Sequence, residues 1–368
     1  MLYDKYQFHT IGEIYGHESI KKDLKKRFKE RDYPRVSLFS GQSGIGKTNL
    51  IHLLSKSILC PDKDKEGNPC NNCRYCQSID RSESIANYKE YNCSTLGIKE
   101  VEAIIEGSTT RSLSEIDVKI IVLDELQQLK SEEAQKSLLK ILEKNNKNVI
   151  WILGTMAIDK IDISVVRRTT LYKLNPISFD DLVYYLVSIC KKEGINDIET
   201  DENKVKTLFT IAENSGGSVG VCLAYLERCI GSEIWTETEL IKELELYSKS
   251  SINKILNYML IGDVTLFDEK LTKTIIPSLF KKLIAYYKYS IGGTLNHFEK
   301  KEIEGVVKTD KKIISFVINE LNKLNNQYYL SSDMIQYSFL NIVDYVRQFI
   351  PEQKPTKLEE RPARVPRS

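Results

Sequence analysis

The amino-acid sequence predicts an α/β domain built on a parallel sheet, followed along the chain by helical regions without strands. Up to about residue 174, short apolar runs alternate with helical patterns, which is typical of parallel strands joined by crossover helices. After Pro176 the strand signals disappear, and apolar residues recur at helical spacing. A chain of 368 residues is long enough for two or three domains.

Three apolar runs are expected to form buried strands of this sheet, at residues 36–39, 120–123 and 149–153. Each run is nearly continuous in apolar residues, as in strands that helices cover on both faces. Between the second and third runs, residues 132–143 are expected to form a helix with Ser131 as its N-cap. Two glutamates in its first turn suit the positive end of the helix dipole.

A phosphate-binding loop (P-loop) directly follows the first strand. Its motif, G-x-x-x-x-G-K-[ST], consists of Gly41, Gln42, Ser43, Gly44, Ile45, Gly46, Lys47 and Thr48. The glycines allow several backbone N–H groups to face one anion, and the N-terminus of the following helix adds positive partial charge. Lys47 is expected to reach the β and γ phosphates of a nucleotide, and the Thr48 hydroxyl to ligate Mg²⁺. The alternative, a glycine-rich turn with a surface lysine, leaves the flanking strand and helix unexplained.

Polar side chains stand at the ends of the second and third strands. Asp124 and Glu125 end the second strand, at the edge of the sheet where ligands bind in open α/β folds. Asp124 is suited to orient Mg²⁺ through water, and Glu125 to polarise the attacking water. Two solvated acids are the alternative. Thr155, which ends the third strand, is a candidate for positioning that water or contacting the γ phosphate, although a strand-end hydroxyl alone is commonplace.

The first four cysteines of the chain have the spacing C-x9-C-x2-C-x2-C; they are Cys60, Cys70, Cys73 and Cys76. Four thiolates so placed can close a tetrahedral shell around zinc and tie down a loop that is too polar to form a core. Disulfides and an iron–sulfur cluster are the alternatives. Zinc is favoured because the fourth cysteine lies upstream, and not three residues downstream as in an iron–sulfur run.

The second half of the chain is expected to be helical. Residues 175–231 form a small helical domain whose first helix begins at a capping-box pattern of Ser178 and Asp181. Residues 232–350 show apolar faces at helical spacing and are expected to form a bundle. Residues 351–368 hold four of the nine prolines and five basic residues, and are expected to be disordered.

Composition excludes several classes of protein. With 53 basic and 51 acidic residues the net charge is only +2, so any DNA contact is expected to be local or shared with other subunits. The longest apolar stretch, residues 149–158, is far too short to cross a bilayer. The first residues lack the apolar segment of a signal peptide. We therefore expect an intracellular protein without membrane contact.

These motifs resemble the ATPase subunit of bacterial clamp loaders, the gamma/tau subunit family of DNA polymerase III within the AAA+ superfamily. The likeness covers roughly residues 3–230. It is carried by residues 5–6, 14–17, 41–48, 58–60, 122–125, 137–143 and 153–155. A zinc module directly after the P-loop helix is distinctive, since AAA+ proteins at large lack it.

This resemblance implies a domain organisation. Residues 1–174 would be an AAA+ ATPase domain with a zinc module at about 60–76. Residues 175–231 would form a lid domain, and residues 232–350 a collar domain that holds an oligomer together. Residues 5–6 and 14–17 match the side of the family's site that holds the nucleotide base.

The sequence departs from the family at two positions. The family carries a Ser-Arg-Cys motif whose arginine reaches into the ATP site of the neighbouring subunit, and the matching stretch here is Arg167, Arg168 and Thr169. Arg168 aligns with that arginine, and its guanidinium would neutralise charge on the transferred phosphoryl group. Arg167 is able to substitute for it, and a solvated pair of arginines is the alternative. In the lid, Gly220 stands where the family has an arginine that senses the γ phosphate.

The leading prediction is an ATP-dependent clamp loader subunit that opens a sliding clamp and places it on primer-template DNA during replication, hydrolysing ATP at subunit interfaces. ATP, Mg²⁺ and Zn²⁺ would be its cofactors. Its partners would be the other subunits of a homo- or hetero-oligomeric pentamer, the sliding clamp and primer-template DNA. It would act in the cytoplasm of a bacterium or of a phage-infected bacterium. Candidates for DNA contact are the basic run at residues 21–31, for which a solvated helix face is the alternative, and Arg111.

Two other functions stay open. One is a non-hydrolysing, nucleotide-binding scaffold subunit of the same kind of complex, which the glycine at position 220 favours. The other is a different DNA-linked AAA+ protein such as a helicase loader. No helix-turn-helix pattern supports the latter.

Overall fold

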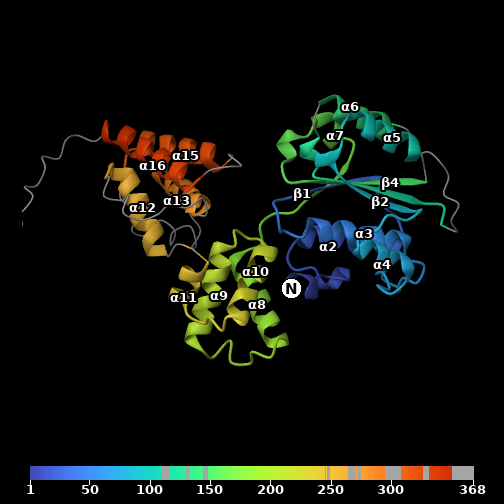
Figure 1. Cartoon of the computed structure of the whole chain (residues 1–368), viewed down its shortest axis with the longest axis horizontal. Helices are drawn as coiled ribbons and strands as arrows, with labels where there is room; N and C mark the ends of the chain where they lie inside the picture. Colours follow the sequence, from blue (N-terminus) through green and yellow to red (C-terminus); the bar gives the residue numbers. More distant parts are fainter. Residues whose placement is uncertain are drawn as a thin grey trace, which may run out of the picture. The chain divides into compact units, whose positions relative to one another are not determined.

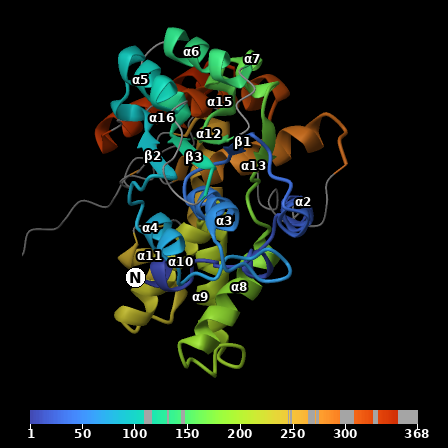
Figure 2. The same cartoon turned by 90° about the vertical axis from the view of Figure 1, so that its right-hand side faces the viewer.

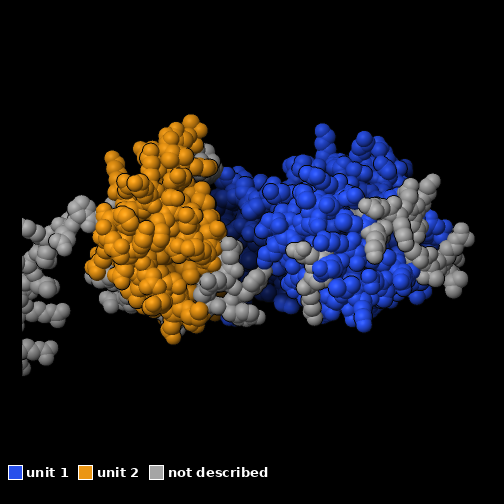
Figure 3. All heavy atoms as spheres, turned by 90° about the horizontal axis from the view of Figure 1, so that it is seen from above, with its two compact units in different colours: residues 1–240 blue, residues 241–368 orange. Residues whose placement is uncertain are grey.

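The chain divides into two compact units, Met1–Leu240 and Ile241–Ser368 (Figure 3). The computed structural model describes residues 1–108, 116–129, 132–143, 148–244, 246, 249–263, 271, 275–294, 308–325 and 331–349. Three positions singled out in the sequence, Arg111, Ser131 and the expected disordered tail at 351–368, lie outside these residues.

A five-stranded parallel sheet forms the centre of the first unit (Figure 1). In the order β2-β3-β4-β1-β5, its strands are β2 Tyr88–Asn92, β3 Lys119–Asp124, β4 Val149–Thr155, β1 Val36–Ser40 and β5 Thr170–Lys173. The three apolar runs correspond to β1, β3 and β4, which occupy the middle of the sheet and are longer than predicted by one or two residues. The prediction of a parallel α/β sheet is confirmed.

The sequence did not predict the two edge strands, β2 and β5. Tyr88 is the buried residue of β2, and Tyr172 that of β5, while the other positions of both strands are exposed or partly exposed. An edge strand pairs with only one neighbouring strand and is less covered by helices than a central strand, so it needs no continuous apolar run. The pattern that marks a central strand is therefore missing from both.

The register of the central strands brings their carboxyl ends to one edge of the sheet. Ser40 at the end of β1 pairs with Thr155 at the end of β4. Leu123 of β3 pairs with Leu153 of β4, so Asp124 follows at the level of the same edge. The P-loop, Asp124 and Thr155 are thus adjacent because β3, β4 and β1 are neighbours in the sheet.

Helices cover both faces of the sheet (Figures 1 and 2). One face carries α2 Glu18–Glu30, α3 Lys47–Leu59 and α4 Arg74–Asp80. The other carries α5 Ile98–Ser108, α6 Glu132–Glu143 and α7 Ile163–Val166. Two apolar clusters fill the layers, one centred on α3 and the other on α6. The predicted helix at 132–143 has the bounds of α6.

The short helix α1 Leu2–Lys5 precedes the sheet along the chain. The part of the first unit that follows the sheet is helical. It contains α8 Phe179–Lys192, α9 Glu202–Asn214, α10 Val219–Gly231 and the start of α11 Glu237–Glu243. The predicted cap of α8 is present: the Ser178 hydroxyl accepts a hydrogen bond from the Asp181 backbone N–H at 3.2 Å.

The second unit is a helical bundle in the residues that the structure describes. Its helices are α12 Lys249–Ile261, α13 Ile275–Ser290, α15 Lys311–Asn325 and α16 Ser332–Arg347. All four contribute to one apolar cluster, which includes Leu256, Leu279, Val317 and Phe339. Among the described helices of the whole chain, none combines the length and the apolar character that crossing a membrane requires.

Candidate functional site

The P-loop turns from β1 into α3 at the carboxyl edge of the sheet. The backbone N–H of Gly41 donates to the carbonyl of Thr155 on the adjacent strand at 3.2 Å, which fixes the start of the loop. Gly46 is the N-cap of α3 with φ of 102°, a left-handed conformation that glycine adopts without steric cost. Thr48 lies in the first turn of α3 and is half-buried. The loop therefore ends at a helix N-terminus, where unpaired N–H groups favour an anion.

Lys47, Asp124 and Glu125 come together at this edge. The Lys47 side chain is 7% exposed, and its ammonium group donates to the Gln42 carbonyl at 3.0 Å. Burial lowers the pKa of Lys47, while the charges of Asp124 and Glu125 oppose this shift. Burial raises the pKa of Asp124, although the Glu125 backbone N–H donates to its carboxylate at 2.8 Å. The oxygens of the two partly buried carboxylates are ligands of the kind that a hard cation such as Mg²⁺ takes.

Gln127 connects Glu125 with Thr155. Its amide group donates to the Glu125 carboxylate, and its amide oxygen accepts from the Thr155 hydroxyl at 2.7 Å and from the Met156 backbone N–H at 3.1 Å. Glu125 has a left-handed φ of 55°, which is uncommon for a residue other than glycine. The Thr155 side chain is fully buried, and its hydroxyl donates to Gln127. No apolar period marks Gln127; its one signal in the sequence is its place just after the strand-end acids.

A cavity of about 490 Å³ adjoins the P-loop. Its lining includes Gly44, Ile45 and Gly46 of the loop, side chains of α8 and α10, and the N-terminal segment, which contributes Phe8, His9, Ile14 and His17. Segments 5–6 and 14–17 both contribute to it. Pockets of this size, apolar with a few polar groups, accommodate small organic ligands.

Two histidines of this cavity have unsatisfied polar atoms. His9 Nδ1 and His17 Nε2 are buried and have no hydrogen-bond partner. Burial lowers the pKa of His17, so its imidazole is neutral at physiological pH. Buried polar atoms are normally paired, and a ligand with hydrogen-bonding edges such as a purine base would pair them. His17 lies in segment 14–17, which resembles the side of the clamp loader site that holds the nucleotide base, whereas His9 belongs to no motif of the sequence.

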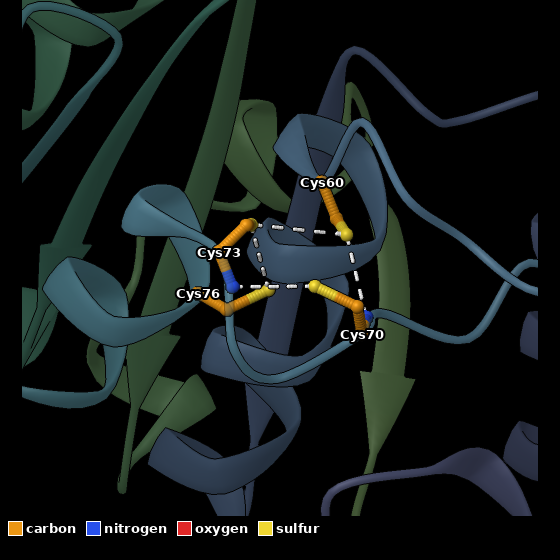
Figure 4. A group of neighbouring side chains, drawn as sticks. All are labelled: Cys60, Cys70, Cys73 and Cys76. Atoms are coloured by element: carbon orange, nitrogen blue, oxygen red, sulfur yellow. Dashed lines mark hydrogen bonds between the residues drawn. The ribbon is translucent and has the colours of Figure 1, made fainter.

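The four cysteines predicted to bind zinc converge where α3 ends and α4 begins (Figure 4). Their Sγ atoms all lie within 4.8 Å of one another. The Sγ of Cys73 is 3.9 Å from that of Cys60 and 3.5 Å from that of Cys76. Tetrahedral zinc with Zn–S bonds of about 2.3 Å requires sulfur atoms about 3.8 Å apart. The residues present therefore fit zinc.

Backbone groups support thiolates at this cluster. The N–H of Cys70 donates to the Sγ of Cys60 at 3.3 Å, and the N–H of Cys73 donates to the Sγ of Cys70 at 3.3 Å. Such N–H groups stabilise the negative charge that metal-bound sulfur carries.

The loop between Cys60 and Cys70 is tied to the N-terminal segment and to α3. The Asn68 side-chain oxygen accepts from the Ile11 backbone N–H at 3.1 Å. The Ser57 hydroxyl donates to the Gly67 carbonyl at 2.9 Å. The cysteine cluster thus braces the segment that lines the cavity.

Comparison with known proteins agrees with this geometry. A family model described as DNA polymerase III, delta subunit, matches residues 16–178. The DNA polymerase III subunit gamma/tau of Mycoplasma genitalium is 26% identical over 341 residues, which cover 89% of this chain and 55% of that protein. These similarities support a clamp-loader-like AAA+ protein.

Other similar proteins have related names. The DNA polymerase III subunit gamma of Buchnera aphidicola subsp. Acyrthosiphon pisum is 31% identical over 52% of this chain and 51% of that protein. The replication factor C small subunit of Methanococcus vannielii is 29% identical over 52% of this chain and 55% of that protein. The chain spans about half the length of these relatives.

The two departures from the clamp loader pattern have different surroundings. Arg168 and Arg167 are exposed at the end of α7, where a guanidinium N–H of Arg168 donates to the Ser164 carbonyl at 3.0 Å. Gly220 lies in the first turn of α10, and its backbone N–H donates to the Gly44 carbonyl of the P-loop at 2.9 Å.

Proposed function

We propose that this chain is an ATP-hydrolysing subunit of a clamp loader, which opens a ring-shaped sliding clamp and places it on primer-template DNA. The convergence of Lys47, Asp124 and Glu125 beside the P-loop of a clamp-loader-like protein carries this proposal. A subunit that served only as a scaffold would have no use for all three side chains.

Each group at the site has a role in this function. Backbone N–H groups of residues 41–48 bind the phosphates, and Lys47 neutralises their charge. Thr48 and Asp124 hold Mg²⁺, which supplies further positive charge when bound. Glu125 accepts a hydrogen bond from the attacking water and polarises it, and Gln127 holds Glu125 in position. The cavity beside the loop receives the adenine base.

Other parts of the chain would serve the assembly. Residues 1–174 act as the ATPase domain, 175–231 as its lid and 232–350 as a collar that joins subunits. Zinc at the cysteine cluster stabilises the module at about 60–76. Arg168 is exposed, as a side chain that reaches a neighbouring subunit must be.

ATP hydrolysis by the reconstituted complex, with clamp and primed DNA, tests the proposal. Lys47→Ala is expected to abolish nucleotide binding and turnover. Arg168→Ala is expected to bind nucleotide normally but to hydrolyse it about 10³-fold more slowly, because arginines supplied in trans contribute that much. Arg167→Ala is the matched control and keeps its activity. Equal loss in the Arg167 and Arg168 variants would contradict the assigned role of Arg168.

A non-hydrolysing scaffold subunit is the second candidate, and Gly220 favours it because glycine offers no charge to the γ phosphate. The same experiment separates the two functions. If the wild type binds nucleotide but hydrolyses it no faster than the Lys47→Ala complex, the scaffold function is supported and the ATP-hydrolysing function is excluded.

A further inference from the structure

The P-loop and the start of α10 are joined by three polar contacts in sequence order. The Gln42 side-chain amide donates to the Gly216 carbonyl at 2.9 Å. The Ser218 hydroxyl donates to the Ser43 carbonyl at 3.4 Å. The Gly220 N–H donates to the Gly44 carbonyl at 2.9 Å. Successive P-loop residues therefore meet alternate residues of the lid, and we call these contacts the P-loop latch.

The latch depends on the absence of side chains at its centre. A Cβ atom on Gly220 would lie 3.1 Å from the Gly44 Cα and 3.2 Å from the Gly44 carbonyl oxygen. A Cβ atom on Gly44 would lie 2.5 Å from the Ser218 hydroxyl oxygen. At position 220 the close neighbours are backbone atoms, which cannot rotate away. A side chain at position 220 therefore requires the two backbones to separate by a few tenths of an ångström, which lengthens the hydrogen bond between them.

The bond to Gly44 also sets the direction of a group that faces the nucleotide. In a trans peptide the carbonyl and the following N–H point in opposite directions. Because the Gly44 carbonyl points to α10, the Ile45 N–H points away from α10. That N–H belongs to the part of the loop whose amides bind phosphate. The lid thereby holds one amide of the anion site in place.

We propose that Gly220 is a positioning residue that couples the lid to the nucleotide through the P-loop backbone, in place of a charged side chain that touches the γ phosphate. This inference rests on the proposed nucleotide site. It implies that the lid responds to the shape of the loop and not to the charge of the third phosphate. Lid closure should therefore increase the binding affinities of ATP and ADP by the same factor.

Hydrogen exchange at the amide of residue 220 tests the latch without any nucleotide. This amide lies in the first turn of α10, where N–H groups have no acceptor within the helix. Protection from exchange in the wild type thus reports the bond to Gly44. Gly220→Ala is expected to lose that protection, although alanine favours a helix more than glycine does. Gly231→Ala in the same helix is the matched control, because an added Cβ there meets nothing within 4 Å.

Nucleotide affinity tests the coupling. Gly220→Ala is expected to lower the affinities for ATP and for ADP by the same factor of about five, the usual effect of one lost hydrogen bond. Gly220→Arg, which restores the family's residue, is expected to lower both affinities as well. Gly231→Ala should leave both affinities unchanged.

Three results would overturn the latch: free exchange at position 220 in the wild type, unchanged affinities in Gly220→Ala, or tighter binding of ATP alone in Gly220→Arg. If the wild type bound no nucleotide, the proposed function would fail first. The exchange experiment would still decide whether the latch forms.

Discussion

Gln127 shows how one amide can connect two groups of an active site. Its two ends differ chemically, so it donates to the carboxylate of Glu125 while it accepts from the hydroxyl of Thr155. The Glu125 backbone sits in a conformation that costs energy, and such conformations persist where surrounding contacts hold them. Removing the amide would free the carboxylate to take other rotamers.

We therefore expect Gln127→Ala to slow ATP hydrolysis by about 10- to 100-fold, the loss that follows when a reacting group shifts by about an ångström. Nucleotide affinity should change little, because Gln127 bonds to Glu125, Thr155 and Met156 and not to the P-loop backbone that binds the phosphates. Single-turnover hydrolysis and equilibrium binding measure the two effects. Gln128→Ala, at the exposed neighbouring position, is the control. Equal rates in both variants would show that Glu125 needs no such support.

At this scale, residues that are contiguous in the chain could be predicted and scattered ones could not. The P-loop is a single segment, so its spacing reveals it. Gln127 and His9 meet the site only through folding. Gln127 lies in a three-residue 3-10 helix, Leu126–Gln128, and His9 in an irregular segment, so no hydrophobic period marks either residue as different from its neighbours.

At the scale of elements, the cysteine cluster links the end of α3 to the start of α4. Because α3 also begins at the P-loop, a metal bound at its far end would stabilise the helix that presents Lys47. An ion pair between the buried Lys56 and the exposed Asp80, at 2.7 Å, connects the same two helices. Spacing alone predicted that the four cysteines form one group, and the fold brings them together.

Removing zinc is expected to destabilise the first unit. A decrease of several kcal/mol in the free energy of unfolding would lower the thermal unfolding midpoint of this unit by about 10 °C. Cys76→Ser should reproduce this effect and eliminate bound zinc, whereas Cys93→Ala, at a buried cysteine outside the cluster, should retain about one zinc per chain. Metal analysis with thermal unfolding provides both readouts. Iron in the purified protein, or full zinc content in Cys76→Ser, would contradict the assignment.

The strands illustrate why elements are predicted unequally. β1, β3 and β4 are covered on both faces, so burial dictates their composition and the sequence reveals them. β2 and β5 pair on one side only, and the tyrosine that each buries is too little to form a pattern. Pairing with a neighbour, which the sequence does not encode locally, makes these segments strands.

At the scale of the whole molecule, the apolar cores are separate. The clusters around α3 and α6 contain residues of the first unit only, and the cluster of the helical bundle contains residues of the second unit only. Since a hydrophobic core is the main source of cooperative stability, each unit should unfold as its own cooperative body.

Calorimetry of the full chain is therefore expected to resolve two unfolding transitions, of which ATP with Mg²⁺ shifts one. At 100 times the dissociation constant, a ligand bound to the folded state adds about 2.7 kcal/mol, which raises the midpoint of a unit of this size by about 5 to 10 °C. The transition of the helical bundle should stay in place, because the side chains described at the P-loop site all belong to the first unit. In Lys47→Ala neither transition should move. A single transition that shifted as a whole would mean that the two units share their stability.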